Sequence, residues 1–396
     1  MLFLFEHYCL DPARRELVAG GRAVEVEPQV FDLLLHLIRN RHRVVSKDDL
    51  IADVWGGRIV SDSTLDSRIN AARKAVGDNG QRQNVIRTVI RKGFRFIAPV
   101  DEVAEANPAA APIIESTAAK QNVSFCRSAD GVRIACATVG NGPPLIKAAN
   151  WLTHVEYDWD SPAWKPFLHW LAEQNHLIRY DGRGTGLSDR DVSDISFGAF
   201  VQDFEAVVNA ANVERFAVLG ISQAAAVAID YAARHPERVS KLVLLGAYAQ
   251  GRKRRGSESE AERAETLLSM LRQGWGDENS AFMRAFASMF IPSGSPEQTK
   301  WVAELQRVTT SAENALRIRK ACDEIDVLAL LPQVRVPTLV LHCRHDGVVP
   351  LEQGRLIAAS IPNARIVTLE SDNHVLLSGE PAWPRFLDEL EAFLRD

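Results

Sequence analysis

Residues 101–121 separate two stretches of sequence with different patterns, and this boundary constrains the fold more than any other feature. The segment reads DEVAEANPAAAPIIESTAAKQ; it is rich in alanine, proline and glutamate and contains no aromatic residue. Because it also lacks an apolar period, it is typical of a linker. The sequence therefore predicts a first domain at residues 1–100, a linker at 101–122 and a second domain at 123–396. A chain of 396 residues also fits two cores better than one.

Charge is distributed unevenly between the two predicted domains. Residues 1–100 carry 16 lysines and arginines against 12 aspartates and glutamates, whereas the rest of the chain carries 30 against 39. A basic first domain and an acidic second domain indicate that only the first one contacts a polyanion.

Cysteine usage and hydropathy predict a cytoplasmic protein. The five cysteines are scattered without a CxxC pair or a Cys/His spacing, so reduced thiols and no metal site are expected. Glu6, His7 and Asp11 interrupt the apolar run that a signal peptide needs. No segment approaches the roughly 20 apolar residues that span a bilayer. We expect no membrane association and no cofactor.

The first domain is predicted to contain three helices and a β-hairpin between short strands. Pro28 occupies a favoured position in the first turn of the first helix, and Ser46 precedes the second helix with Asp49 three residues on. The third helix begins in the Ser61–Ser63 cluster and ends at Gly77. Strands are expected at Phe3–Phe5, Glu16–Val18, Ala23–Val26, Val85–Ile90 and Phe94–Ala98.

The third predicted helix has a polar face that fits DNA. Its apolar positions recur at helical spacing and form a buried stripe of Leu65, Ile69, Ala72 and Val76. The other face carries hydroxyl, amide and guanidinium groups, which contact base edges and phosphates in protein–DNA complexes. A cationic face is also common on helices that contact only solvent, so the helix alone leaves both interpretations open. The predicted DNA-contacting residues are Ser63, Thr64, Ser67, Arg68, Asn70, Arg73 and Lys74 in this helix, with Arg91 and Lys92 at the hairpin tip.

Residues 24–98 resemble the OmpR/PhoB-type winged-helix effector domain of response regulators. The resemblance rests on FDLLLHL in the first helix, LIADVW in the second, VSDSTLDSRI at the start of the third and TVxxxGFRF in the hairpin. It implies that the third helix enters the major groove and that the hairpin is a wing on the backbone or minor groove. Asn70 and Ala71 stand where the family often has arginine, which implies a different base preference. The sequence carries no phosphoacceptor receiver domain, so phosphorelay control is not expected.

After the linker, apolar strands alternate with helices, which is the signature of an α/β sheet. The strands are short apolar runs of the kind found in parallel sheets that are covered on both faces. A long insert at about residues 249–330 is predicted to contain helices only. The predicted strands are Pro144–Ala149, His176–Tyr180, Arg215–Leu219, Lys241–Leu245, Thr338–His342 and Ala364–Leu369.

A serine stands at the turn between one predicted strand and its helix. Ser222 lies within a G-x-S-x-A segment, with Gly220 and Ala224 where the strand and helix backbones approach each other. Such a turn lifts the hydroxyl clear of the sheet and places it at a helix N-terminus, as a nucleophile requires. An ordinary turn between a strand and a helix also fits these five residues. The position within a βα alternation favours a nucleophile elbow.

Two further residues stand in the chain order of a serine hydrolase. Asp346 lies just past the strand at 338–342, and His374 follows the strand at 364–369. Loops beyond the carboxyl ends of strands are where α/β sheets assemble their sites. A single aspartate or histidine there is usually structural, but three residues in order, each after a strand, favour a triad with Ser222.

The second part of the chain, residues 123–396, resembles the α/β-hydrolase superfamily. The motif DGRGTGLS, which begins at Asp181, matches the D-x-R-G-x-G-x-S turn of that superfamily. The resemblance implies that Ser222 is the nucleophile, His374 the general base and Asp346 the acid that orients it. It also implies that the helical insert is a cap over the pocket.

The oxyanion hole departs from the family pattern. The resemblance implies that the backbone N–H of Gln223 supplies one donor and that a His-Gly pair after the strand at 144–149 positions the other. This chain has Asn150 and Trp151 there instead. The N–H of Trp151 can still donate, although its indole narrows the pocket. Because the loss of one donor lowers rates by about 10²–10³, efficient turnover is not assured.

Aromatic residues are concentrated at 151–170 and in the helical insert, and most of them are expected in the core. Some are expected to line an apolar pocket under the cap, which suits an aromatic or acyl ligand. The run Arg252–Arg255 fits contact with DNA or with an anionic ligand, but a solvated loop is the favoured interpretation.

The sequence thus predicts a one-component DNA-binding transcription regulator whose α/β-hydrolase-fold domain binds a small organic effector, with slow hydrolysis left open. Two alternatives stay open beside it. One is a true serine esterase, lactonase or C–C hydrolase with an autoregulatory DNA-binding module, and the other is an inactive hydrolase fold that only dimerises. The expected partners are double-stranded DNA, an apolar, aromatic or acyl effector, and a second copy of the chain, because two half-sites strengthen the binding of a small reader domain.

Overall fold

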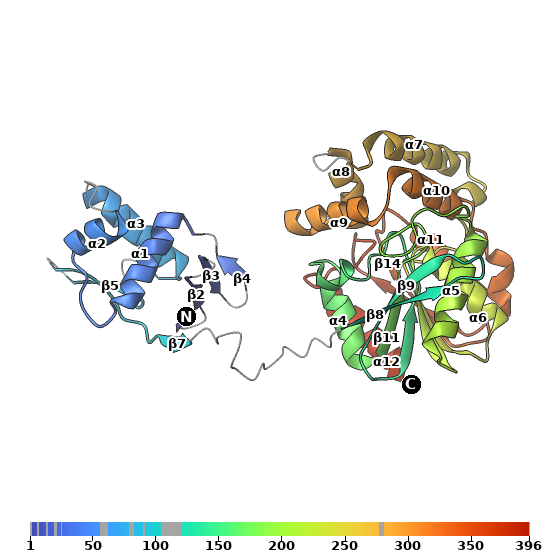
Figure 1. The fold of residues 1–396 in the computed structure, drawn as a ribbon, viewed down its shortest axis with the longest axis horizontal. Coiled ribbons are helices and arrows are strands. Elements are labelled where there is room, and N and C mark those ends of the chain that lie inside the picture. The colour runs from blue at the N-terminus through green and yellow to red at the C-terminus, as the bar shows by residue number, and fades with distance from the viewer. Residues whose placement is uncertain are drawn as a thin grey trace. The chain divides into compact units, whose positions relative to one another are not determined.

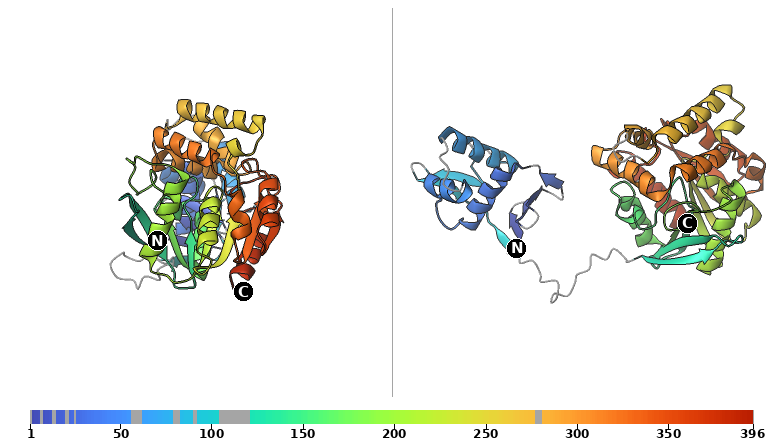
Figure 2. Two further views of the ribbon diagram at one scale, coloured as in Figure 1. Left: turned by 90° about the vertical axis from the view of Figure 1, so that its right-hand side faces the viewer. Right: turned by 45° about the horizontal axis from the view of Figure 1, so that its top comes forward.

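The computed structural model comprises two compact units, Met1–Ile114 and Glu115–Asp396. Figures 1 and 2 show both as ribbons. The linker predicted at 101–122 is shortened at both ends, because residues 101–103 form a strand of the first unit and residue 122 begins a strand of the second. Residues 104–120 lie outside the described part of the chain. The structure describes residues 2–5, 8–12, 15–19, 22–24, 26–55, 62–78, 83–89, 92–103, 121–276 and 281–395.

The first unit combines a small antiparallel sheet, three helices and a hairpin. The sheet has the order β4-β3-β2-β1-β7. Its strands β2 and β7 were not among the predicted ones; both pair with β1 through main-chain hydrogen bonds, which a local sequence pattern does not record. The elements are β1 (Leu2–Phe5), β2 (Tyr8–Asp11), β3 (Glu16–Ala19), β4 (Arg22–Val24), α1 (Pro28–Arg39), α2 (Lys47–Val54), α3 (Asp62–Ala75), β5 (Ile86–Val89), β6 (Gly93–Phe96) and β7 (Asp101–Val103).

Local sequence signals define the helices and the hairpin of this unit. The side chain of Ser46 accepts a hydrogen bond from the N–H of Asp49, whose carboxylate accepts one from the N–H of Ser46, and this capping box starts α2. Gly93 opens β6 at a φ of +131°, and a Cβ there would lie 2.0 Å from the carbonyl oxygen of Val45. Only glycine therefore allows the hairpin to approach the loop before α2, to which it is joined by a bridge between Val45 and Phe94.

The second unit is built on an eight-stranded sheet of order β15-β14-β13-β12-β10-β11-β9-β8. The six strands from β10 to β15 are parallel, as predicted, whereas β9 and β8 form an antiparallel hairpin at one edge that was not predicted. The alternating exposure of β8 differs from the buried apolar runs of the other strands, which explains why it was missed. The strands are β8 (Asn122–Arg127), β9 (Arg133–Val139), β10 (Pro144–Lys147), β11 (His176–Tyr180), β12 (Phe216–Ile221), β13 (Val239–Leu245), β14 (Thr338–Cys343) and β15 (Ala364–Leu369).

Helices cover both faces of this sheet and enclose two apolar cores. One core packs α5 (Phe197–Ala211), α6 (Ala224–Arg234) and α11 (Leu351–Ser360) against the sheet. The other packs α4 (Lys165–Gln174) and α12 (Trp383–Arg395) against the opposite face. Because the central strands are buried on both faces, their sequences are continuous apolar runs.

The predicted helical insert between β13 and β14 is confirmed over its described residues, and Figure 1 shows α7–α10 together at one end of the sheet. No helix in the described residues has both the length and the apolar character needed to cross a membrane. The helices of the insert are η2 (Arg252–Arg254), α7 (Glu258–Gly274), α8 (Ala281–Phe290), α9 (Pro296–Thr309), α10 (Ala312–Asp323) and η3 (Leu328–Gln333).

Candidate DNA-binding face and candidate active site

Helix α3 and the β5–β6 hairpin form the candidate DNA-binding face of the first unit. The predicted side chains on this face have different surroundings. Arg68 is 30% exposed and forms an ion pair with Glu27. The side chain of Ser63 and the whole of Arg91 lie outside the described residues. The exposed predicted residues are Thr64, Ser67, Asn70, Lys74 and Lys92. The predicted buried stripe is confirmed, since its members are at most 1% exposed: Leu65, Ile69, Ala72 and Val76.

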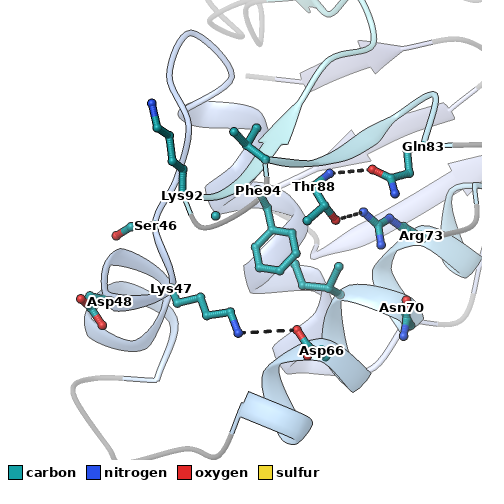
Figure 3. Close-up of a pocket in the computed structure, with 13 residues that line it drawn as sticks. Ser46, Lys47, Asp48, Asp66, Asn70, Arg73, Gln83, Thr88, Lys92 and Phe94 are labelled. Atoms are coloured by element: carbon teal, nitrogen blue, oxygen red, sulfur yellow. Dashed lines mark hydrogen bonds and ion pairs between the residues drawn. The ribbon is translucent and has the colours of Figure 1, made fainter. Parts of the chain in front are cut away.

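Arg73 corrects the prediction, because it does not face solvent. The side chain is 5% exposed and points from α3 onto the hairpin. Its Nε and Nη2 donate to the carbonyl oxygen of Ile86 at 3.0 and 2.9 Å, and Nη2 also donates to Thr88 Oγ1 at 2.8 Å. Figure 3 shows the bond between Arg73 and Thr88. Arg73 therefore joins the wing to α3 through Nε and Nη2, which makes it a positioning residue of this face rather than a solvent-facing side chain.

A groove of about 760 Å³ runs between α2, α3 and the hairpin. Figure 3 shows Lys47, Asn70 and Lys92 around it. Lys47 Nζ lies 3.9 Å from Asp66 Oδ1, which is a weak, exposed ion pair. A phosphate backbone that passed between a helix in one groove and a wing in the next would meet these polar groups.

Ser222 occupies a sharp turn between β12 and α6, as predicted. Its φ is +56°, a left-handed conformation that is rare for a residue with a side chain and is found at strained functional turns. The N–H of Ser222 donates to the carbonyl oxygen of Leu245 at 2.9 Å and fixes the turn to the neighbouring strand. A Cβ at Gly220 would lie 2.7 Å from Ala225 Cα, so only glycine lets α6 approach β12 this closely.

His374 and Asp346 form a buried hydrogen-bonded pair. His374 Nδ1 and Asp346 Oδ2 are 2.6 Å apart, and the N–H groups of Val348 and Val349 donate to Asp346 Oδ1 at 2.8 and 3.0 Å. Burial opposes ionisation of the Asp346 carboxyl, but the charge and hydrogen bond of His374 outweigh it and lower its pKa. The carboxylate therefore stays ionised and holds the imidazole with Nδ1 protonated.

The far side of the His374 ring faces the cavity that contains Ser222. We call this space, of about 40 Å³, the serine cavity; its lining includes Ser222, His374, Trp151 and Gln306. His374 Nε2 is buried and has no protein partner among the described residues, and no hydrogen bond joins it to Ser222. Such bonds are often long before a ligand binds, so the geometry permits the proton transfer of a triad without showing it formed.

The turn after β10 stands opposite Ser222 but differs from a His-Gly turn. Trp151 lines the serine cavity, and its indole packs against Trp275 and Phe286 with ring centroids 6.2 and 6.1 Å away. The next residue, Leu152, has a φ of +48°. Gln223 precedes the first residue of α6, so its N–H belongs to a helix N-terminus that carries no intrahelical bond. The residues that carry the candidate oxyanion-hole N–H groups, Trp151, Leu152 and Gln223, therefore lie around Ser222.

Comparison with known families decides the class of the second unit. A family model described as alpha/beta hydrolase fold matches residues 160–381, which is more than half of the chain. The chain belongs to this family. A second model, described as transcriptional regulatory protein, C terminal, matches residues 21–96. One polypeptide therefore joins the DNA-binding domain of a transcription regulator to an α/β-hydrolase domain.

Three similar proteins each cover between 55% and 69% of this chain. The chain is 26% identical over 253 residues to the AB hydrolase superfamily protein YisY of Bacillus subtilis, which covers 63% of this chain and 91% of that protein. It is 29% identical over 232 residues to the putative carbamate hydrolase RutD of Azorhizobium caulinodans, covering 55% and 81%. A solved hydrolase from Pseudomonas aeruginosa PA01 superposes with a TM-score of 0.57 at 25% identity, over 69% of this chain and 98% of that one.

The hydrolase domain is closed around Ser222 and His374. The serine cavity holds about 40 Å³, little more than a water molecule or two need. The aromatic residues that line it are Trp151 and Trp164 from the first segment and Phe290 from the helical insert. A ligand of organic size therefore enters only if the cap or the Trp151 indole moves.

The cap of the hydrolase domain is hydrogen-bonded to the loop that carries His374. The N–H groups of His374 and Val375 donate to the carbonyl oxygen of Phe290, at the end of α8, at 2.9 and 3.2 Å. The N–H of Ser293 donates to the side chain of the fully buried Asn373 at 3.0 Å. A movement of α8 that admitted a ligand would therefore act directly on the histidine loop.

A second small cavity of the hydrolase domain adjoins Ser222 and was missed from sequence. We call it the arginine cavity, because Arg252, Arg255 and Arg319 line it together with Ser222 and Gln223. The expectation of a solvated loop at Arg252–Arg255 is wrong for Arg252, which is 9% exposed. It is also wrong for the side chain of Arg255, which is 9% exposed. The sequence of residues 252–255 alone did not indicate burial, because the cavity is formed only together with Arg319 of α10, which is distant in the chain.

Gln306 is a further residue that sequence reasoning missed. It lies in α9, is 2% exposed and lines the serine cavity. Neither its Nε2 nor its Oε1 has a partner among the described residues. An amide left unpaired in an apolar cavity is costly unless a ligand completes its hydrogen bonds, so Gln306 is a candidate ligand contact.

Proposed function

We propose that the chain is a one-component transcription regulator in the cytoplasm, in which the winged helix binds an operator and the hydrolase domain binds a small organic effector under its cap. The observation that carries the proposal is the union, in one polypeptide, of a DNA-binding regulator domain with a cap-covered site that holds Ser222, Asp346 and His374. A second copy of the chain would supply the other half of the DNA contact.

In this proposal the exposed residues of α3 read the DNA. Thr64, Ser67 and Asn70 offer groups for base edges, while Lys74 and Lys92 offer positive charge for phosphates. Arg73 is left out of this set because it is bonded to the hairpin. Its role is to hold the wing in place.

The effector is proposed to act through the cap. Because the serine cavity is too small for an organic molecule, binding requires α8, α9 or Trp151 to move. The hydrogen bonds from His374 and Val375 to Phe290 would transmit such a movement between the cap and the site. A ligand shifts the equilibrium between two forms only by the difference in its affinity for them, and a closed and an opened cap differ strongly in this respect.

The second candidate function is a working serine hydrolase with a DNA-binding module that controls its own gene. The 2.6 Å bond between His374 and Asp346 and the left-handed turn at Ser222 favour it. In that case Ser222 Oγ attacks an acyl carbon while His374 Nε2 takes its proton, and Asp346 keeps the ring oriented. The N–H of Gln223 holds the developing oxyanion, with a second donor from Trp151 or Leu152. The names of relatives such as the putative carbamate hydrolase RutD are consistent with acyl chemistry.

The reactivity of Ser222 separates the two candidates. We would treat the protein with a neutral fluorophosphonate, compare it with Ser222→Ala by intact mass, and then measure turnover of esters and lactones. Labelling confined to Ser222 with turnover near about 10 s⁻¹ supports the hydrolase. Labelling with little or no turnover supports the effector site.

DNA binding is tested separately with fragments from around the gene that encodes the chain. We expect sequence-selective binding that weakens steeply with salt, since phosphate contacts release counterions. Its absence would contradict the regulator, whatever Ser222 does.

A further inference from the structure

The arginine cavity is an unusual neighbour for a nucleophilic serine. Its three guanidinium groups come from η2, the loop after it and α10, and the space between them reaches Ser222 and Gln223. The cavity has a volume of about 20 Å³, so it is a small polar recess beside the reacting group rather than an open surface patch. Trp151, Ser222 and Phe290 line both this cavity and the serine cavity, so the two cavities adjoin.

Two of the three arginines are neutralised by the protein itself. Arg255 Nη1 lies 2.9 Å from Glu260 Oε2, and Arg319 Nε donates to Asp323 Oδ2 at 3.1 Å. Glu260 Oε1 also forms an ion pair with the exposed Arg263 at 3.0 Å, so the negative charge of Glu260 is shared between two arginines. Positive charge therefore exceeds negative charge around the cavity.

Arg252 is the group without a counterion. It is 9% exposed, its Nη2 donates to the carbonyl oxygen of Val348 at 3.1 Å, and no carboxylate pairs with it among the residues that the structure describes. Burial lowers its pKa most, the positive charges of Arg319 and Arg255 lower it further, and the carboxylates of Asp323 and Glu260, which form no ion pair with it, oppose this. A buried cation with these surroundings is unfavourable in the free protein and gains stability when an anion reaches it.

We propose that the arginine cavity binds a carboxylate group of the effector, with Arg252 as the main contact, while an acyl group of the same molecule faces Ser222. This inference rests on the proposed function, because it assigns the effector to the same site. A guanidinium matches the two oxygens of a carboxylate in a planar, bidentate bond. The cavity volume of about 20 Å³ is room for one or two water-sized atoms, which suits a carboxylate better than the three oxygens of a phosphate.

The position of the cavities also assigns the rest of the ligand. The serine cavity adjoins the arginine cavity at Ser222 and Trp151 and is lined mostly by apolar residues around the unpaired amide of Gln306. The effector class is therefore an acyl compound with a carboxylate at one end and a mostly apolar body with one hydrogen-bonding group at the other. Half-esters of dicarboxylic acids, and lactones with a carboxylate, have this pattern.

The test uses a probe series with and without the charge. We would measure the binding of the monomethyl esters of succinate, glutarate and adipate to Ser222→Ala by tryptophan fluorescence, and compare each with its dimethyl ester. Three chain lengths are used so that one of them spans the distance from Ser222 to Arg252. We expect the anionic member of at least one pair to bind about tenfold or more tightly, which is the usual effect of a charge-assisted hydrogen bond.

Variants identify the group responsible. In the Ser222→Ala background, Arg252→Gln removes the charge but keeps a shorter, polar side chain, and we expect it to abolish the preference for the anion. Arg252→Lys restores part of it. Arg254→Met is the matched control, because Arg254 is on the same short helix but is 53% exposed and paired with Glu324, and it keeps the full preference.

The outcomes separate this inference from the proposed function. If every dimethyl ester binds as tightly as its monoanion, or if Arg252→Gln keeps the preference, the carboxylate site is refuted. Neither result depends on the nucleophilicity of Ser222, because the binding is measured in Ser222→Ala. Absence of sequence-selective DNA binding, together with preferred binding of the anion, refutes the proposed regulator and leaves the carboxylate site in place. Failure of fluorophosphonate labelling in the wild type refutes catalysis alone.

Discussion

Replacement of Arg73 by alanine is expected to loosen the wing of the DNA-binding domain rather than to remove a DNA contact. The substitution deletes three hydrogen bonds from a charged group, two to the Ile86 carbonyl and one to Thr88 Oγ1. The net stabilisation from hydrogen bonds of this kind is about 1.5–3 kcal/mol. Because the bonds share one side chain, we expect a total loss of about 2–3 kcal/mol in the local opening free energy of α3 and β5.

The assay is hydrogen exchange on the full chain, because its two units make a single unfolding free energy ill-defined. A loss of about 2 kcal/mol raises the exchange rate of protected amides in α3 and β5 roughly 30-fold. Lys74→Ala is the control: the side chain is exposed, so exchange stays unchanged while DNA affinity falls. If Arg73→Ala leaves exchange unaltered and weakens DNA binding as Lys74→Ala does, Arg73 is a DNA contact after all and the assignment is refuted.

Three further predictions concern the hydrolase domain. Asp346→Asn should lower fluorophosphonate labelling of Ser222 by about 10³-fold or more with the fold intact by circular dichroism, because the amide no longer fixes the tautomer of His374 through the 2.6 Å bond; unchanged labelling would exclude a working triad. Gly246→Ala should lower labelling at least about tenfold, because Gly246 has a φ of +54° and the new methyl group would lie 2.9 Å from His374 Cε1. Gly131→Ala is the control: its φ is also positive, at +89°, but no atom lies within 4 Å of the new methyl group, so labelling should not change. Burial lowers the pKa of Lys147 to about 8 from an ordinary value of 10.5, so at this group the folded state binds fewer protons than the unfolded state between these values, and Lys147 contributes a rise in stability with pH in that window. In urea unfolding followed by tryptophan fluorescence, the slope of stability against pH should be more positive in the wild type than in Lys147→Met; equal slopes would contradict it.

The elements that carry the triad could be predicted because each signal is local. A buried parallel strand is an apolar run, and the residue just past its end is fixed in space by the sheet. Ser222, Asp346 and His374 were found in this way, and the structure brings Asp346 and His374 into contact and places Ser222 in the same cavity as His374. Their chemical roles are part of the proposed function.

Other features depend on tertiary contacts that no local pattern records. Helical periodicity places Arg73 beside the buried stripe, but only the position of the Ile86 carbonyl decides that its long side chain turns inward. The burial of Arg252 depends in the same way on Arg319 and Val348, which are distant in the chain. The closed state of the cap also follows from packing, because volumes of cavities are set by how side chains interlock.

Coupling between the two domains is the central claim, and one titration tests it most directly. The affinity of the protein for its preferred DNA fragment is measured before and after complete modification of Ser222 by a fluorophosphonate, with Ser222→Ala treated in parallel. We expect occupancy of the site to change the affinity about fivefold or more in the wild type, as allosteric couplings of 1–3 kcal/mol do, and to leave Ser222→Ala unaffected. The same affinity for DNA with Ser222 fully modified as with Ser222 free would contradict a regulator that senses its effector at this site.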